Sequence, residues 1–285
     1  MAMKKVKMRL QGHEKFVLRE GWINKGLIAV EEMTDAFTRK DAPDIFGIGS
    51  NMVKSLRYWM RVLGLTNDNG SELSGLGKMI RKFDPYLEDT TTLWLLHSNI
   101  ANNKENATTW YMYFNHCDAD DLGKNQITTI LTREITKYAN GQSFSEKSLS
   151  NDVDVLLNMY SKNKEKIDPE DKNISPFSKL GLIKKQEGKY AKSHPNKKYF
   201  SEWIVLYEIS KMIEGRTSIS IEEIINGDNG LSKIYNLTSV MANDLLDKLD
   251  SAGKIRVDRT AGLDMVYPIE KLSPDEIVEK YYEKY

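Results

Sequence analysis

Residues 44–65 (DIFGIGSNMVKSLRYWMRVLGL) constrain the fold most, because they predict two helices joined by a tight turn at residues 47–49. From Gly49 onward, two stripes recur at helical spacing. One stripe is apolar and would face a core: Val53, Leu56, Met60 and Leu63. The other is basic and aromatic: Lys54, Arg57, Tyr58 and Arg61. A helix that enters a DNA groove needs cations for phosphates and donors for base edges, so this stripe predicts a DNA-binding face. The alternative is a solvated basic face with no partner.

Composition is that of a soluble globular protein of two or three domains, with 285 residues, 40% of them hydrophobic and 29% charged. No apolar run approaches the length of a membrane span, so we expect no membrane partner and a cytoplasmic location. The single cysteine, Cys117, excludes an intramolecular disulfide and a Cys-rich zinc site.

Charge is distributed unevenly along a chain whose net charge is zero. Residues 1–82 hold 15 Lys and Arg against 9 Asp and Glu, whereas residues 201–285 hold 10 against 16. A polyanion, if one binds, would therefore meet the N-terminal part. A small imbalance of solvated charge is the alternative.

The predicted fold is mainly α with small β wings, in which two winged-helix modules flank a helical middle region. The first module covers residues 1–83, with an extended arm or edge strand at 4–10 and a wing at the Asn67–Gly70 turn. The middle region covers residues 84–200, with a charged linker at 161–173 and a possible β-hairpin at 182–199. The last module covers residues 201–285. Its helix in the recognition position has an acidic face, which favours a structural or protein-binding role: Asn243, Asp244, Asp247, Lys248 and Asp250.

No strong catalytic signature occurs in the chain. The best candidate is the pair His13 and Glu14 in a Gly-led loop, with Arg19 and Lys25 nearby in sequence. A histidine and a carboxylate can perform general acid-base catalysis or hold a divalent ion. The alternative, which the residues alone favour, is that the pair ties the arm to the first module.

Other polar residues have structural explanations. The acidic group Asp84, Glu88 and Asp89 has two explanations, a Mg²⁺ site or the start of a helix. The second is commoner, because negative charge is favourable at a helix N-terminus. His97 has the spacing of a core histidine, and Asp152 and Asp154 are expected to be solvated.

Several blocks of the sequence resemble one protein family: GHEKF at residues 12–16 with Arg19 and Trp22, GIGSNMVKSLRYW at 47–59, LEDTTTLWLLH at 87–97, TTWYMYFN at 108–115 and SNDVDVLLNMY at 150–160. Together they resemble the SspB-type component of bacterial DNA phosphorothioation systems. The likeness runs over nearly the whole chain. One departure is Ser175, where the resemblance leads us to expect a cysteine.

The resemblance implies a DNA-nicking protein that works with a cysteine desulfurase, an ATPase and an ATP-pyrophosphatase-like sulfur-transfer enzyme. Such a system replaces a non-bridging phosphate oxygen by sulfur, often in phage defence. The matching positions are His13, Glu14, Arg19, Asn51, Lys54, Ser55, Arg57 and Tyr58.

Residues and resemblance together predict a nickase of double-stranded DNA. The predicted catalytic residues are His13 and Glu14, with Mg²⁺ as the cofactor and with its ligands unidentified. The predicted DNA-binding residues are Arg19, Lys25, Ser50, Asn51, Lys54, Ser55, Arg57, Tyr58 and Arg61. The rival hypothesis is a non-catalytic winged-helix DNA-binding adaptor or transcriptional regulator. A pure protein scaffold is a third.

Overall fold

The structure is a computed structural model that describes residues 6–161 and 174–284. The chain forms two compact units that divide between Ser193 and His194. The three-part division expected from the sequence, with boundaries after residues 83 and 200, stays a prediction. Apart from Ser161, the expected linker at 161–173 lies outside the described residues.

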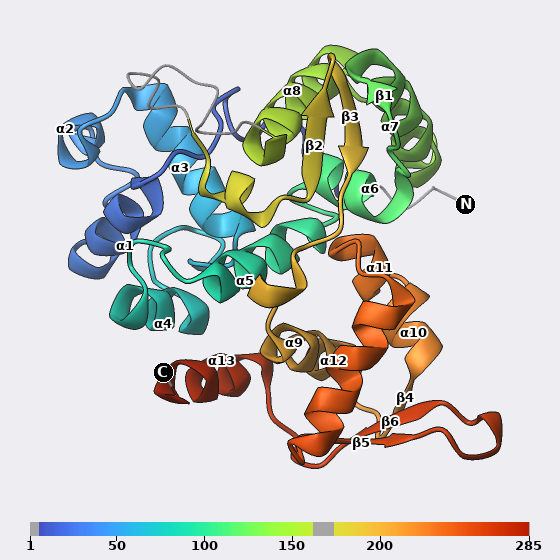
Figure 1. The fold of residues 1–285 in the computed structure, drawn as a ribbon. Helices are drawn as coiled ribbons and strands as arrows, with labels where there is room; N and C mark the ends of the chain where they lie inside the picture. Colours follow the sequence, from blue (N-terminus) through green and yellow to red (C-terminus); the bar gives the residue numbers. More distant parts are fainter. Residues whose placement is uncertain (1–5, 162–173, 285) are drawn as a thin grey trace, which may run out of the picture. The chain divides into compact units, whose positions relative to one another are not determined.

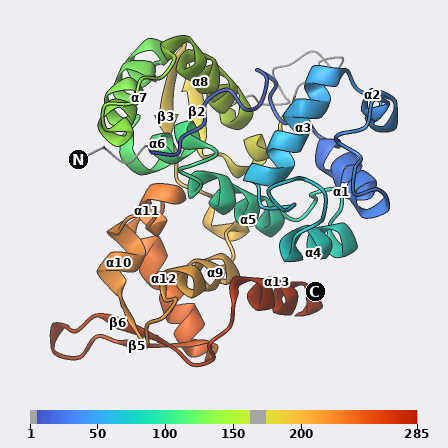
Figure 2. The same ribbon diagram turned by 180° about the vertical axis from the view of Figure 1, so that it is seen from behind.

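The first unit is mainly helical (Figure 1). Its helices and strands are α1 (Trp22–Glu32), α2 (Ala42–Phe46), α3 (Ser50–Val62), α4 (Gly75–Phe83), α5 (Thr90–Ala101), α6 (Thr108–His116), β1 (Leu122–Gly123), α7 (Lys124–Ala139), α8 (Glu146–Ser161), the 3-10 helix η2 (Pro176–Leu180), β2 (Ile183–Gln186) and β3 (Lys189–Lys192). Figures 1 and 2 show α1–α4 at one end of this unit and the strands with α7 and α8 at the other end.

The two helices expected at residues 44–65 are α2 and α3. Gly47 ends α2 with φ of 60°, a left-handed conformation that glycine adopts without strain. The four residues of the apolar stripe are all buried, as predicted: Val53, Leu56, Met60 and Leu63. α1 packs against α3, with Gly26 of α1 next to Met60, and also contributes the buried Ile23 and Leu27 to the core. The two helices and the turn between them thus lie where the sequence predicted them.

The expected β elements of residues 1–83 are mostly missing. No strand forms over residues 6–10, the described part of the predicted arm, so the edge strand is wrong there. The predicted wing contains one isolated antiparallel bridge, between Thr66 and Leu73. The Asn67–Gly70 turn closes through a backbone hydrogen bond from Gly70 N to Asn67 O.

A three-stranded antiparallel sheet lies instead in the middle region. Its strand order is β1-β3-β2, with Leu122 opposite Tyr190 and Ile183 opposite Lys192. The chain runs through α6, β1, α7, α8 and then the hairpin β2–β3. Sequence periodicity indicated α7 and α8 but gave no sign that a two-residue strand joins the hairpin.

The second unit repeats this order of elements. It contains the 3-10 helix η3 (Lys197–Tyr199), α9 (Glu202–Met212), β4 (Ile219–Ser220), α10 (Ile221–Asn226), α11 (Leu231–Ile234), α12 (Ser239–Ser251), β5 (Ile255–Asp258), the 3-10 helix η4 (Thr260–Gly262), β6 (Met265–Pro268) and α13 (Pro274–Lys284). The sheet order is β4-β6-β5, in which the first strand pairs with the last. A helix, a short strand, further helices and a hairpin therefore occur in the same sequence in both units.

Within the described ranges, 6–161 and 174–284, none of the helices combines the length and apolarity that crossing a bilayer requires.

Candidate nucleic-acid interface

The first half of α3 presents short polar side chains to solvent. Ser50, Asn51 and Lys54 are exposed. The Lys54 ammonium donates to Asn51 Oδ1 at 3.3 Å, so the amide and the cation lie together on one face. Gly49 caps this helix with φ of −64°, and it brings no side chain over that face. Ser50, Asn51 and Lys54 thus form an exposed polar face on the first half of α3.

Arginines gather farther along the same helix. Arg57 is half-buried and donates to the backbone oxygen of Asn69, which holds the Asn67–Gly70 turn against α3. Arg61 is also half-buried, and its Nε and one terminal nitrogen lie below the surface without a hydrogen-bond acceptor among the described residues. Burial lowers the pKa of Arg61, and the positive charge of Arg9 adds to that effect. Two guanidinium groups that repel one another form a site where an anion is favourable.

Arg9 was not among the predicted site residues. Its guanidinium carbon lies 5.4 Å from the centre of the Tyr58 ring, so the N-terminal segment brings an extra cation to α3. The backbone N–H of Arg9 donates to Thr108 Oγ1 of α6 at 3.0 Å, which fixes the segment in place.

Two of the predicted DNA-binding residues are buried, which corrects their expected exposure. Ser55 has no exposed surface, and Tyr58 is only 4% exposed. Burial raises the pKa of the Tyr58 phenol, and the nearby charge of Asp152 raises it further. The N-terminal segment covers Tyr58, because a Cβ on Gly12 would lie 2.4 Å from its ring carbons. Tyr58 thus supports the loop rather than facing a duplex.

Arg19 and Lys25 lie on the first part of the chain. Arg19 is half-buried, with its guanidinium 5.4 Å from the Trp22 ring centre. Lys25 is exposed, and its ammonium donates to Phe46 O at the end of α2 at 3.0 Å. Lys25 therefore reaches the turn that precedes α3, whereas Arg19, which precedes α1, packs on Trp22 at the start of that helix.

His13, one of the two predicted catalytic residues, is fully buried. Its ring stacks on Trp59 of α3, with ring centres 5.7 Å apart and planes 12° apart. Its Nε2 lies 2.8 Å from Asp152 Oδ1 of α8, and its Nδ1 accepts the backbone N–H of Lys15 at 3.1 Å. Because its Nδ1 accepts an N–H, the hydrogen of the ring is assigned to Nε2, which donates to Asp152.

Asp152 is the centre of this buried network, and its expected solvation is wrong. It is 2% exposed. One carboxylate oxygen accepts from His13 and from the backbone N–H of Gln11 at 2.8 Å, and the other accepts from Thr109 Oγ1 at 2.7 Å. The network joins the N-terminal loop to α6 and α8. The structure therefore favours the structural alternative for His13.

Glu14 differs from His13, because its side chain is exposed. Its φ of 49° and the φ of 66° at Lys15 place both residues in the left-handed region, at the tip of the loop. No hydrogen bond or ion pair of the Glu14 carboxylate occurs among the described residues. The loop that His13 fixes thus presents a free carboxylate to solvent.

We expect Gly12→Ala to lower the free energy of unfolding by about 1–3 kcal/mol, because the added methyl group would overlap the buried Tyr58 ring. Urea unfolding followed by circular dichroism measures the change. Gly49→Ala is the matched control, since a Cβ there meets nothing within 4 Å. Equal stabilities of the two variants would contradict the packing of the loop on Tyr58.

The described residues contain no group of three or more His, Cys, Asp or Glu side chains arranged to hold a metal ion. The acidic group at the start of α5 is used for capping. Both Asp84 oxygens accept backbone N–H groups, from Glu88 at 2.8 Å and Asp89 at 3.2 Å, and Asp89 accepts from Thr91 N at 2.8 Å. A preformed all-protein Mg²⁺ cage does not fit these residues, whereas a site of one carboxylate completed by water and phosphate does fit Glu14.

Fold and surface together define a class, that of mainly helical proteins with small antiparallel sheets, here with exposed Lys54 and half-buried Arg57 and Arg61 on α3. The family described as "Protein of unknown function (DUF4007)" matches residues 10–282, and the chain belongs to that family. No curated protein matches the chain.

Two solved structures share the fold. One, described as "SspB crystal structure", has 23% sequence identity and a TM-score of 0.84, and the match covers 98% of this chain and 88% of the other. The second, described as "Magnesium ion-bound SspB crystal structure", has the same identity and coverage and a TM-score of 0.83. The mainly α fold predicted from the sequence is confirmed, as a mainly helical chain with small antiparallel sheets that is similar in fold to these two structures.

Proposed function

We propose that this protein is the DNA-binding component of a DNA phosphorothioation system. The observation that carries the proposal is the combination of exposed Asn51 and Lys54 with the unpaired guanidinium nitrogens of Arg61 on one helix. Asn and Lys can donate to base edges, and arginine binds phosphate oxygens. The similarity to SspB supports the placement in a sulfur-modification system, together with a cysteine desulfurase, an ATPase and an ATP-pyrophosphatase-like enzyme as partners.

In this proposal α3 is the recognition helix. Ser50, Asn51 and Lys54 in its first half meet the groove, while Arg61 and Arg9 meet the phosphates beside it. Arg57 holds the Asn67–Gly70 turn next to the helix, as a wing would be held. We also propose two winged-helix modules besides the α2–α3 region, one from α6 to β3 and one from α9 to β6, because a helix, a short strand, further helices and a hairpin follow one another in each.

The acidic face of α12 supports a different role for the second unit. Its carboxylates are partly neutralised from within the unit, because Lys197 pairs with Asp244 at 2.5 Å and Arg259 with Asp247 at 2.7 Å. Lys197 and Arg259 therefore pair with carboxylates of α12 and are not available to bind phosphates. We propose that this unit contacts protein partners rather than DNA.

We propose nicking as the chemical step, with Glu14 as the catalytic residue and His13 as a positioning residue. Hydrolysis of a phosphodiester requires a water that attacks phosphorus while the bond to one ester oxygen breaks. The Glu14 carboxylate takes the proton of that water, the leaving oxygen takes a proton from solvent, and a cation stabilises the charge on phosphorus. Mg²⁺, which one of the similar structures carries, would supply Lewis acidity beside Glu14.

The test of this function is a plasmid assay with purified protein and Mg²⁺. We expect wild-type protein to convert supercoiled plasmid to the open circle, and Glu14→Gln to reduce the rate at least about tenfold because the amide is no longer a base. Glu32→Gln is the matched control, since Glu32 is exposed on α1, away from the loop tip.

The outcomes separate two hypotheses. Nicking by Glu14→Gln at the wild-type rate would remove Glu14 from the reaction. DNA binding by wild-type protein without nicking would favour a non-catalytic adaptor or transcriptional regulator, a candidate that the engagement of both His13 ring nitrogens supports. An absence of duplex binding at low salt would reject both and leave a protein scaffold.

A further inference from the structure

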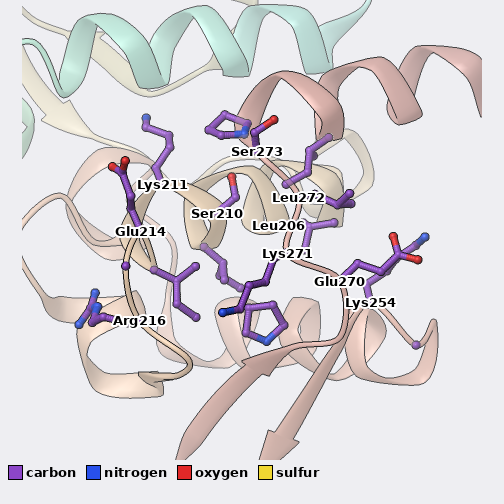
Figure 3. A pocket seen from close by; sticks show the side chains of 17 residues that line it. Leu206, Ser210, Lys211, Glu214, Arg216, Lys254, Glu270, Lys271, Leu272 and Ser273 are labelled. Carbon is purple, nitrogen blue, oxygen red and sulfur yellow. The ribbon is translucent and has the colours of Figure 1, made fainter.

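The second unit contains a cavity of about 680 Å³ that the proposed DNA interface does not use (Figure 3). It lies among the end of α9, the loop that follows it, the α12–β5 turn and the connection from β6 into α13. Its volume is in the range of sites that enclose a small organic molecule.

The cavity has an apolar part, formed by side chains from three segments of the unit: Leu206, Ile209, Ile213, Pro268, Leu272 and Ile277. Ile209 and Ile277 are almost completely buried, whereas Ile213 and Leu272 retain exposed surface. Apolar side chains that line a concave surface favour a ligand with an apolar body, because the ligand removes that surface from water.

The net charge of the residues that line the cavity is opposite in sign to the net charge of the second unit. Residues 194–285 hold 12 Lys and Arg against 16 Asp and Glu, a net charge of −4. The lining holds four cations, Lys211, Arg216, Lys254 and Lys271, against two anions, Glu214 and Glu270. A cationic rim on an acidic unit attracts anions to this one place.

Most of the rim cations already have partners. Arg216 pairs with Glu223 at 2.9 Å, Lys211 with Glu208 at 3.4 Å, and the Lys254 ammonium lies 5.5 Å from the Trp203 ring centre. Lys271 is exposed and has no hydrogen-bond or ion-pair partner in the described part of the chain.

Figure 3 places Lys271 centrally in the cavity. Lys211 and Glu214 lie on one side, Lys254 and Glu270 on the other, and Ser210 and Lys271 between them. In this view the unpaired Lys271 therefore lies between the two charged sides of the lining. A ligand that fills the cavity would bring its polar end next to this cation.

We propose that this cavity binds a small organic anion with an apolar body, whose anionic group pairs with Lys271. Binding uses residues of the second unit alone, so the proposal is independent of DNA binding by α3. Enclosure of the apolar body supplies affinity, and Lys271 supplies selection for the negative charge.

The test compares two fluorescent probes of similar shape on the full-length protein. The anionic probe is 8-anilinonaphthalene-1-sulfonate, and the neutral one is N-phenyl-1-naphthylamine. We expect both to bind at one saturable site per chain. Lys271→Ala should raise the Kd of the anionic probe about fivefold, as expected for a partly exposed ion pair, and leave that of the neutral probe unchanged.

Ser210→Trp tests the location of the site. The indole would occupy the centre of the cavity, so we expect the Kd of both probes to rise at least tenfold. Lys248→Ala, at an exposed position of α12 outside the cavity, is the charge-matched control and should change neither Kd. Circular dichroism and DNA affinity should match wild type in all three variants.

Three results would overturn the proposal: non-saturable probe binding, unchanged binding by Ser210→Trp, or equal effects of Lys271→Ala on both probes. None of these criteria uses DNA affinity, so the experiment tests the proposed cavity ligand independently of the proposed DNA interface on α3.

Discussion

Replacing Asp152 by alanine is expected to lower the free energy of unfolding of the first unit by about 3–5 kcal/mol, the range found when one partner of a buried polar network is removed. The variant leaves three donors without their acceptor: His13 Nε2, the Gln11 N–H and Thr109 Oγ1. Two of those groups lie on fully buried side chains, so water cannot replace the carboxylate without opening the core. Urea unfolding followed by tryptophan fluorescence measures the loss, since Trp59 stacks on His13.

Asp154→Ala is the matched control for this experiment. Asp154 lies on the same helix, two residues along, and pairs with Lys124 at 2.6 Å with 48% of its side chain exposed. A surface ion pair contributes roughly 0–1 kcal/mol, so a small effect is expected. If the two variants lost the same free energy of unfolding, the hydrogen-bond network around Asp152 would not contribute the stability that we assign to it.

The second large effect concerns DNA. Combining Arg9→Ala, Lys54→Ala and Arg61→Ala is expected to weaken duplex binding at least about 100-fold at low salt. The slope of log K against log salt should become shallower by about 1.8, because Arg9 and Arg61 are the proposed phosphate contacts and each such contact contributes about 0.9 through counterion release. Fluorescence anisotropy with a labelled duplex over a range of salt concentrations measures both quantities. Arg57 is left in place, since it holds the turn at Asn69.

The control for this variant is Lys248→Ala on α12, which removes a cation from the second unit. We expect it to leave both the affinity and the salt slope unchanged. A triple variant that binds DNA with the wild-type affinity and slope would exclude α3 from the interface. If Lys248→Ala weakened binding equally, the second unit would contact DNA, and its proposed restriction to protein partners would be wrong.

Periodicity was sufficient to predict the core side of α3, because four apolar residues at helical spacing must share one face. It also indicated His97 as a core histidine, and in the structure His97 is buried with its Nδ1 2.8 Å from the Tyr160 hydroxyl. Local patterns are informative in these cases because the residues that define a buried face lie on one helix, whatever packs against it.

Helical spacing wrongly predicted that Tyr58 and Asp152 are exposed, and both errors have the same cause. Tyr58 belongs to the polar stripe by spacing, but the loop around Gly12 folds over it. Asp152 alternates with Asp154 in a helix and looks solvated, yet its partner His13 is 139 residues away. The spacing of residues within a helix cannot predict which distant segment of the chain will pack on that helix. The one available signal was that these residues fall within blocks that resemble the same family.

The three-stranded sheets could not be predicted from the sequence, because one strand in each of them is very short. Strands β1 and β4 are two residues long, which is too short for an alternating pattern. Each joins its hairpin through pairing with the last strand, so tertiary packing rather than local propensity decides that it is a strand.

The link between His13 and Asp152 also sets an order of events during synthesis. When residues 1–65 leave the ribosome, α3 has all of its residues and Trp59 is available to His13, but the polar groups of the Gly12 loop have no acceptor. That acceptor, Asp152, emerges only with α8. Contacts so distant in sequence form late in folding. The nascent chain therefore keeps the donors of His13 and Gln11 unsatisfied until more than half of the protein has been made.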